Sequence, residues 1–244
     1  MKKENKSIFS KALFSIILIL ISFPSVVLAG EAYVFERMWP DIRQYYFKWP
    51  YSVGLDGKGA VYVVDSYNDQ IQKFNENGAL ITKWGKFGDG DGEFHLPYNI
   101  AADENYVYVT DSQNRRIQKF DLDGNFVAKW GSKGESDNEF LFPTGISIGI
   151  AGNIYVVDTD RNSIRKFTRD GEFIHRWGAF GTGDGEFKNP HGIATDREGY
   201  VYVADSQNHR IQKFTSKGIF VTKWGSEGRE NGLFRSPEGI AVDN

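Results

Sequence analysis

A repeat of 46 or 47 residues runs through most of this chain of 244 residues. Five of the seven prolines share this spacing, as do four tryptophans that precede a glycine and four aspartates that follow an apolar run. Three unrelated residue types with one period do not arise from composition, so the chain consists of repeated structural units. The repeating residues are Pro50, Pro97, Pro143, Pro190 and Pro237, then Trp84, Trp130, Trp177 and Trp224, and Asp65, Asp111, Asp158 and Asp205.

Each unit predicts four short β-strands. In the fourth unit these are 192–196, 200–204, 210–214 and 219–224, which are rich in β-branched and aromatic residues and separated by polar or glycine-containing turns. The second strands carry apolar residues at successive positions, as in 106–109, so both of their faces are expected to be buried. A four-stranded antiparallel unit with this period is typical of a β-propeller blade, and the predicted fold class is all-β.

The residues of these units resemble the NHL repeat. The string Val201-Tyr-Val-Ala-Asp-Ser-Gln-Asn-His-Arg-Ile-Gln-Lys-Phe carries the resemblance, and 107–120 repeats it closely. The glycine-rich links at 88–94 and 183–187 agree with the same family. Blades of the WD type end in Trp-Asp rather than Trp-Gly, and the YWTD family lacks the Asn-x-Arg-Ile-Gln-Lys-Phe continuation. The resemblance covers about residues 50–243 and implies a propeller that serves as an interaction module.

The period also predicts where the blades begin and end. The family usually closes a ring of six blades, whereas this sequence accounts for four complete blades and single strands at both ends. We therefore expect an open or truncated six-bladed propeller, whose unclosed blade edge favours self-association. The predicted segments are a partial blade and link over 30–49 with its last strand at 35–39, NHL blades over 50–96, 97–142, 143–189 and 190–236, and a further first strand over 237–244.

The N-terminus has the features of a secretory signal peptide. Four lysines precede an apolar run over 12–23, and the small residues Val27 and Ala29 come before Gly30. An uncleaved membrane anchor is less favoured, because it needs about 20 continuous apolar residues and serines interrupt this run. Cleavage of 1–29 would leave 25 basic and 31 acidic residues, a net charge of −6. We expect a secreted or extracytoplasmic protein without a membrane span after signal cleavage.

Residues that recur in every blade are expected to serve the fold. The repeating aspartates should accept hydrogen bonds from turn amides, and the repeating tryptophans should wedge between blades. Arg116 and Arg210 are expected to pair within their loops, with surface recognition as the alternative. In the link before the second blade, Asp89, Asp91 and Glu93 suggest calcium, but such a site needs more oxygen ligands and the third link loses the spacing. We predict no metal and no cofactor.

Function is expected where the blades differ. The residue after each repeating proline and the residue two after each loop aspartate should surround the channel on one face of the propeller. Tyrosine suits recognition there, because it buries a large area at little entropic cost. The alternative, that these side chains only cap the core, remains open. The candidate ligand-binding residues are Tyr51, Tyr67, Tyr98, Gln113, Thr144, Asp160, His191 and Gln207, with Glu238 at the equivalent place after Pro237.

The favoured function is non-catalytic binding of a protein, peptide or glycan. The alternative is a propeller enzyme of the amidating-lyase or lactonase/hydrolase type with a metal in the central channel. His191 and Tyr67 resemble amidating-lyase positions, but a catalytic zinc needs several protein ligands, and the other blades carry Tyr, Thr or Glu where His191 stands.

Two further functions known for NHL proteins are disfavoured. RNA binding needs a basic face, whereas the mature chain would be acidic and exported. The absence of cysteine excludes disulfides, thiol nucleophiles and the cysteine-ligated zinc domains of ubiquitin ligases.

Overall fold

The computed structural model describes residues 47–243. The described residues all belong to one compact unit, Arg37–Asn244. The signal peptide over 1–29 and the strand expected at 35–39 lie outside the described residues, so both remain predictions. Among the described residues, no helix is long and apolar enough to cross a membrane.

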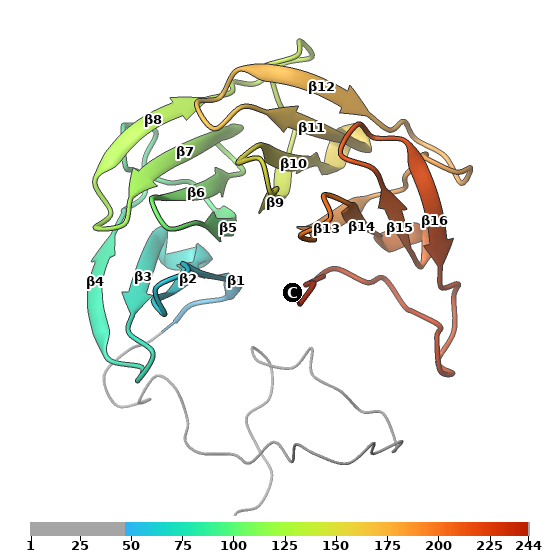
Figure 1. Cartoon of the computed structure of the whole chain (residues 1–244). Coiled ribbons are helices and arrows are strands. Elements are labelled where there is room, and N and C mark those ends of the chain that lie inside the picture. The colour runs from blue at the N-terminus through green and yellow to red at the C-terminus, as the bar shows by residue number, and fades with distance from the viewer. Residues whose placement is uncertain (1–46, 244) are drawn as a thin grey trace, which may run out of the picture. The chain divides into compact units, whose positions relative to one another are not determined.

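The strands form four antiparallel sheets of four, each in sequence order. Figure 1 shows the sheets around a common axis, with β1, β5, β9 and β13 innermost and β4, β8, β12 and β16 outermost. The bounds are Pro50–Leu55 (β1), Val61–Asp65 (β2), Gln70–Phe74 (β3), Leu80–Trp84 (β4), Pro97–Ala102 (β5), Tyr106–Asp111 (β6), Arg116–Asp121 (β7), Phe126–Trp130 (β8), Pro143–Ile148 (β9), Ile154–Asp158 (β10), Ser163–Phe167 (β11), Phe173–Trp177 (β12), Pro190–Thr195 (β13), Val201–Asp205 (β14), Arg210–Phe214 (β15) and Phe220–Trp224 (β16), with 3-10 turns Ser66–Asn68 (η1), Thr159–Arg161 (η2) and Ser206–Asn208 (η3).

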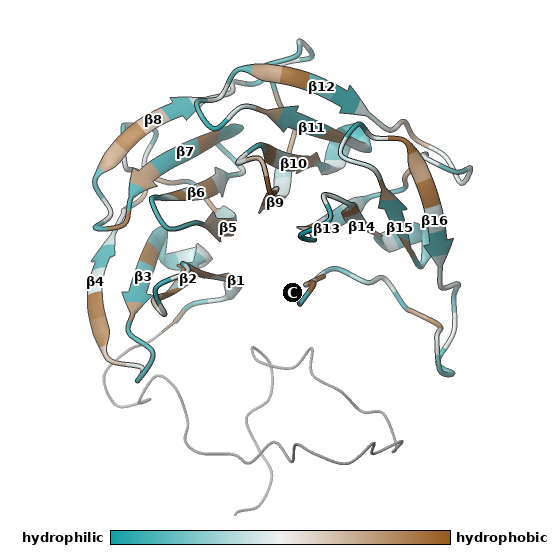
Figure 2. Ribbon diagram, in the orientation of Figure 1, coloured by the Kyte–Doolittle hydropathy of each residue, from teal (hydrophilic) through white to brown (hydrophobic). Residues whose placement is uncertain are grey.

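The hydrophobic core lies between neighbouring blades. One cluster joins Tyr62 and Val64 of the first blade to Val107 and Phe120 of the second, and equivalent clusters join the second blade to the third and the third to the fourth. The second strands are therefore buried on both faces, which confirms the predicted propeller arrangement of four-stranded blades. Figure 2 also shows hydrophobic segments along the outermost strands.

Each repeating tryptophan packs at the end of an outermost strand. The Trp84 ring centroid lies 5.7 Å from that of Phe120 in the next blade. It also lies on Gly124, where the backbone is left-handed and an added Cβ would come within 2.6 Å of the indole. Trp130 and Trp177 make the equivalent contacts with the blade that follows, while Trp224 is 41% exposed. Three of the four tryptophans therefore fill an interface between described blades.

The segment after Pro237 takes the place of a fifth innermost strand. The Ser206 hydroxyl donates to the carbonyl oxygen of Pro237 at 2.6 Å, as the Thr159 hydroxyl donates to that of Pro190 at 2.7 Å. Gly192 lies against the carbonyl oxygen of Glu238, so that only a glycine fits. Residues 237–243 are not a strand by hydrogen bonding, although they occupy the predicted position.

Candidate functional site

The residues that follow the repeating prolines meet at the axis. The ring centroids of Tyr51 and Tyr98 are 4.8 Å apart, and those of Tyr98 and His191 are 6.0 Å apart. The Tyr98 hydroxyl lies 3.2 Å from Nδ1 of His191. Thr144 is fully buried, and its hydroxyl donates to the His191 carbonyl oxygen at 3.3 Å. Because each residue stands at the start of an innermost strand, the repeat itself brings these side chains together.

Two exposed rings extend this group outward. Tyr67 of η1 lies 6.4 Å from Tyr51 between ring centroids, at an interplanar angle of 76°. Trp49 lies 5.7 Å from Tyr67. These three rings are the accessible part of the group, since Trp49 is 66%, Tyr67 47% and Tyr51 42% exposed. We call Trp49, Tyr51, Tyr67, Tyr98 and His191 the axial aromatic cluster.

Sequence reasoning missed Trp49 and also Phe142, whose ring centroid lies 6.3 Å from that of Tyr98. Each directly precedes a repeating proline. An aromatic residue directly before the repeating proline is therefore the sequence feature that identifies both.

His191 is held at both of its ring nitrogens. Nδ1 faces the Tyr98 hydroxyl, and Nε2 lies 2.9 Å from Nδ2 of Asn189. Burial lowers the pKa of His191, and the carboxylates of Glu238 and Asp160 oppose that shift. A neutral imidazole has one donor and one acceptor nitrogen, which matches these two neighbours. His191 is therefore uncharged at neutral pH, and its two neighbours hold the imidazole in place at one side of the cluster.

The tyrosines of the cluster are kept in their neutral form. Burial, followed by the Glu238 carboxylate and Tyr51, raises the pKa of Tyr98 to about 12. The pKa of Tyr51 is also raised, by burial, by Tyr67 and by Glu238. Glu238 therefore lies close enough to act on three members of the cluster.

The remaining predicted site residues stand in the loops after the second strands. The backbone amides of Gln113 and Gln207 donate to link carbonyl oxygens, at 3.1 Å to His95 and 3.0 Å to Lys188. Asp160 is exposed and acts on His191 electrostatically. The structure thus joins Tyr51, Tyr67, Tyr98, Thr144 and His191 by direct contact, whereas the described hydrogen bonds of Gln113 and Gln207 are with the links and, for Gln113, with Arg115 of its own loop.

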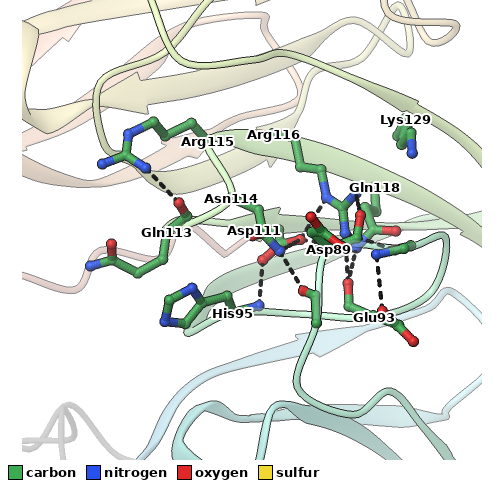
Figure 3. A network of polar contacts seen from close by, with 12 residues as sticks. Asp89, Glu93, His95, Asp111, Gln113, Asn114, Arg115, Arg116, Gln118 and Lys129 are labelled. Carbon is green, nitrogen blue, oxygen red and sulfur yellow. Dashed lines mark hydrogen bonds and ion pairs between the residues drawn. The ribbon is translucent and has the colours of Figure 1, made fainter.

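The loop aspartates anchor the links between blades. Asp111 is fully buried and accepts hydrogen bonds from the His95 amide at 2.8 Å and from the side chains of Asn114, Arg116 and Gln118 (Figure 3). Burial raises the pKa of Asp111, and these donors act in the opposite direction.

The prediction that the loop aspartates bind turn amides was wrong. Asp65, Asp158 and Asp205 make no capping hydrogen bond to the 3-10 turns that follow them. Their carboxylates instead accept from link amides 16 or 17 residues earlier in the chain. A side chain that points back to the link joins consecutive blades, which a local turn contact would not do.

Arg116 completes the same network. Its Nε lies 2.7 Å from Asp111, and its two terminal nitrogens donate to the carbonyl oxygens of Asp89, Gly90 and Glu93. Arg210 repeats this pattern on Asp205 and the link that precedes the fourth blade. Both guanidinium groups are buried, as the pairing prediction requires, and are thus inaccessible to a partner.

Two of the three carboxylates in the link before the second blade pair with lysines. Asp91 pairs with Lys129 at 2.6 Å, and Glu93 pairs with Lys86 at 3.0 Å. Among residues 47–243, no group of three or more His, Asp or Glu side chains is placed to hold a metal ion.

This architecture, four-stranded blades around an axis with a variable axial mouth, is that of a β-propeller. The NHL repeat profile matches residues 187–214, and the profile of a 6-bladed β-propeller family matches 53–129 and 97–166. The chain is therefore an NHL-repeat β-propeller protein. No curated protein matches its sequence.

Solved structures share the fold. A streptogramin B lyase is 17% identical with a TM-score of 0.56 over 72% of this chain and 54% of the lyase chain. Catalytically inactive virginiamycin B lyase from Staphylococcus aureus with quinupristin is 17% identical, TM-score 0.58, over 80% and 60%. A chain of a nidogen/laminin complex is 20% identical, TM-score 0.59, over 80% and 68%. The chain thus spans little more than half the length of the two lyases.

Proposed function

We propose that this protein is an exported, non-catalytic binding scaffold whose axial aromatic cluster binds a protein, peptide or glycan. The observation that carries the proposal is the exposure of three adjoining rings, Trp49, Tyr51 and Tyr67, at the mouth of a rigid propeller. Aromatic residues are enriched in protein interfaces, and rigid scaffolds commonly present binding residues on loops.

The inner half of the cluster supports the outer half. Tyr98 contacts Tyr51 on one side and His191 on the other, and Asn189 fixes the far edge of the imidazole. A partner would therefore meet rings that are already ordered, which reduces the entropic cost of binding. One of the similar structures is a nidogen/laminin complex, which is in line with a binding role.

A lyase is the second candidate, favoured by the likeness to two lyases and by a histidine at the axis. Metal analysis of the purified protein distinguishes the two. Stoichiometric zinc that disappears in His191→Ala would support the enzyme and overturn the scaffold proposal.

The binding proposal is tested with peptide and glycan arrays. The variant is Tyr51→Ala/Tyr67→Ala, and the matched control is Phe87→Ala/Phe180→Ala, which removes two link rings that are 67% and 70% exposed. We expect ligands whose binding is lost in the first variant and kept in the second. Ligands that bind both variants like the wild type would place the site elsewhere and overturn the proposal.

The predicted self-association has its own structural support. Val53 and Leu55 of β1 are exposed, whereas the residues equivalent to Val53, namely Ile100, Ile146 and Ile193, are buried against the preceding blade. Light scattering of the wild type and of Val53→Ser/Leu55→Ser tests this proposal. It predicts a smaller mass for the variant.

A further inference from the structure

We infer that the group recognised by the axial aromatic cluster is an organic cation, the lysine or arginine side chain of a basic peptide. This inference rests on the proposed binding function and adds the chemistry of the ligand. It combines three observations, namely ring faces at an open corner, unpaired carboxylates beside them, and a lysine of the chain itself on one ring.

The first observation is the geometry of two exposed tyrosines. The rings of Tyr51 and Tyr67 meet at 76° with centroids 6.4 Å apart. Two rings at a steep angle form a corner in which one cation can face both. An ammonium or guanidinium within about 6 Å of a ring centroid is attracted by the negative charge of the ring face. Such a corner is suited to a long side chain with a charged tip.

The second observation is the sign of the charges around the axial aromatic cluster. Glu238 and Asp160 are both exposed, and neither forms an ion pair within residues 47–243. Glu238 acts on Tyr51, Tyr98 and His191, and Asp160 acts on His191. The cluster therefore lies in the field of two carboxylates. That field attracts a cationic ligand and repels an anionic one.

The third observation is Lys48. Its Nζ lies 5.9 Å from the centroid of the Tyr67 ring, so one ring of the cluster already faces an ammonium. Lys48 also adds a positive charge beside the corner, where Glu238 offsets it, and Asp160 adds a second carboxylate on the His191 side of the cluster. Arg115 is held away by its own loop, where Nη1 donates to the Gln113 carbonyl oxygen at 2.7 Å. Over the whole axial aromatic cluster, two carboxylates thus stand against one ammonium.

The test uses short peptides that differ in one side chain. The probes are Ac-Gly-X-Gly-amide with X as lysine, arginine, norleucine or glutamate, together with a neutral cello-oligosaccharide. Binding is measured by titration with NMR detection of the protein amides around Tyr51 and Tyr67. We expect the lysine and arginine peptides to shift these signals and the norleucine and glutamate peptides to leave them unchanged.

Variants then assign the binding to the corner. Tyr51→Ala and Glu238→Gln should each raise the dissociation constant of the lysine peptide about fivefold, which corresponds to one exposed cation–π or ion-pair contribution. Phe180→Ala and Glu198→Gln are matched controls, since both remove an exposed group elsewhere, and should leave it unchanged. Thermal unfolding of each variant verifies that it is folded.

The outcomes separate this inference from the proposed function. If norleucine or the oligosaccharide binds at the corner as well as lysine does, the cation inference is overturned and the binding scaffold stands. If Glu198→Gln weakens binding as much as Glu238→Gln, the attraction is diffuse and the inference is again overturned. If no peptide or sugar, here or on the arrays, binds at the cluster, both proposals fail.

Discussion

The second and third blades hold the same loop aspartate with different sets of side chains. In the second blade, Arg116 stands opposite Asp111 in the strand pair and its Nε lies 2.7 Å away. Gln118, two residues further, donates to both Asp111 and the Glu93 carbonyl oxygen and accepts from the Gly92 amide. The arginine and the glutamine thus each bind both the carboxylate and the link.

In the third blade both of these positions carry a different residue. Ser163 stands opposite Asp158, and Arg165 takes the place of the glutamine. Arg161 and Arg165 both approach Asp158 at 3.5 Å. Arg165 is fully buried and donates to the carbonyl oxygens of residues 136 and 137 in the link.

Among residues 47–243, no cation pairs with the loop aspartate of the first blade. Asp65 is fully buried and accepts from the side chains of Asn68, Gln70 and Gln72 and from the Lys48 amide. The comparison shows that the link is anchored by a buried acceptor surrounded by donors. The positive charge can come from different positions or be absent, while the backbone geometry of the blade remains the same.

The largest predicted loss of stability follows removal of the aspartate in the third blade, where two arginines lie beside its carboxylate. Asp158→Ala leaves two arginines without their carboxylate and should lower the free energy of unfolding by about 3–5 kcal/mol. Asp65→Ala leaves only neutral donors and should cost about 1–3 kcal/mol. Urea unfolding measures both, and equal losses would show that charge does not distinguish the two blades.

The next effect concerns the residue opposite the aspartate. Arg116→Ala removes an ion pair and three hydrogen bonds to the link, and should cost about 2–3 kcal/mol because Asp111 keeps its other donors. Gln70→Ala, at the same position in the first blade, should cost about 1 kcal/mol. The two losses are compared from the urea unfolding midpoints, provided that the dependence of the unfolding free energy on urea is the same in both variants. A Gln70→Ala loss as large as that of Arg116→Ala would contradict the comparison.

The repeated part of this molecule could be predicted from sequence because its determinants are local. Alternating apolar residues and glycine turns define each blade, and residues at equivalent positions necessarily meet at the axis. Tyr51, Tyr98 and His191 were therefore foreseen as neighbours. The same symmetry predicted the tryptophans between blades.

The missed features depend on geometry that residue type does not reveal. Trp49 and Asn189 have left-handed backbones, with φ of 51° and 52°, and their side chains contact Tyr67 and His191. Asp111 reaches a link amide 16 residues earlier, which no local turn pattern predicts. Long-range hydrogen bonds and side-chain direction were thus the parts that required the structure.

A smaller predicted effect concerns a backbone difference between the links before the second and the third blade. Gly92 has a left-handed backbone with φ of 76°, and the nearest atom to an added Cβ is 4.0 Å away. Gly92→Ala should therefore cost about 1–2 kcal/mol through the backbone alone. Asn138, at the equivalent place in the third link, does not have a positive φ, so Asn138→Ala should change stability by less than about 0.5 kcal/mol. Thermal unfolding compares them, and equal costs would mean that the links do not differ in backbone.

The smallest effect extends the comparison to the residue after the proline, which is Thr144 in the third blade and His191 in the fourth. Burial places the folded-state pKa of His191 below its ordinary value. The unfolded chain then binds the proton first, so stability is complete above about pH 6.5 and falls as the pH drops toward the folded pKa. The free energy of unfolding of His191→Gln should decline less between pH 7 and pH 5 than that of the wild type. The matched control is His175→Gln, which removes an exposed imidazole of β12 outside the axial aromatic cluster. Parallel slopes for His191→Gln and the wild type would show that the imidazole is not held neutral by the cluster.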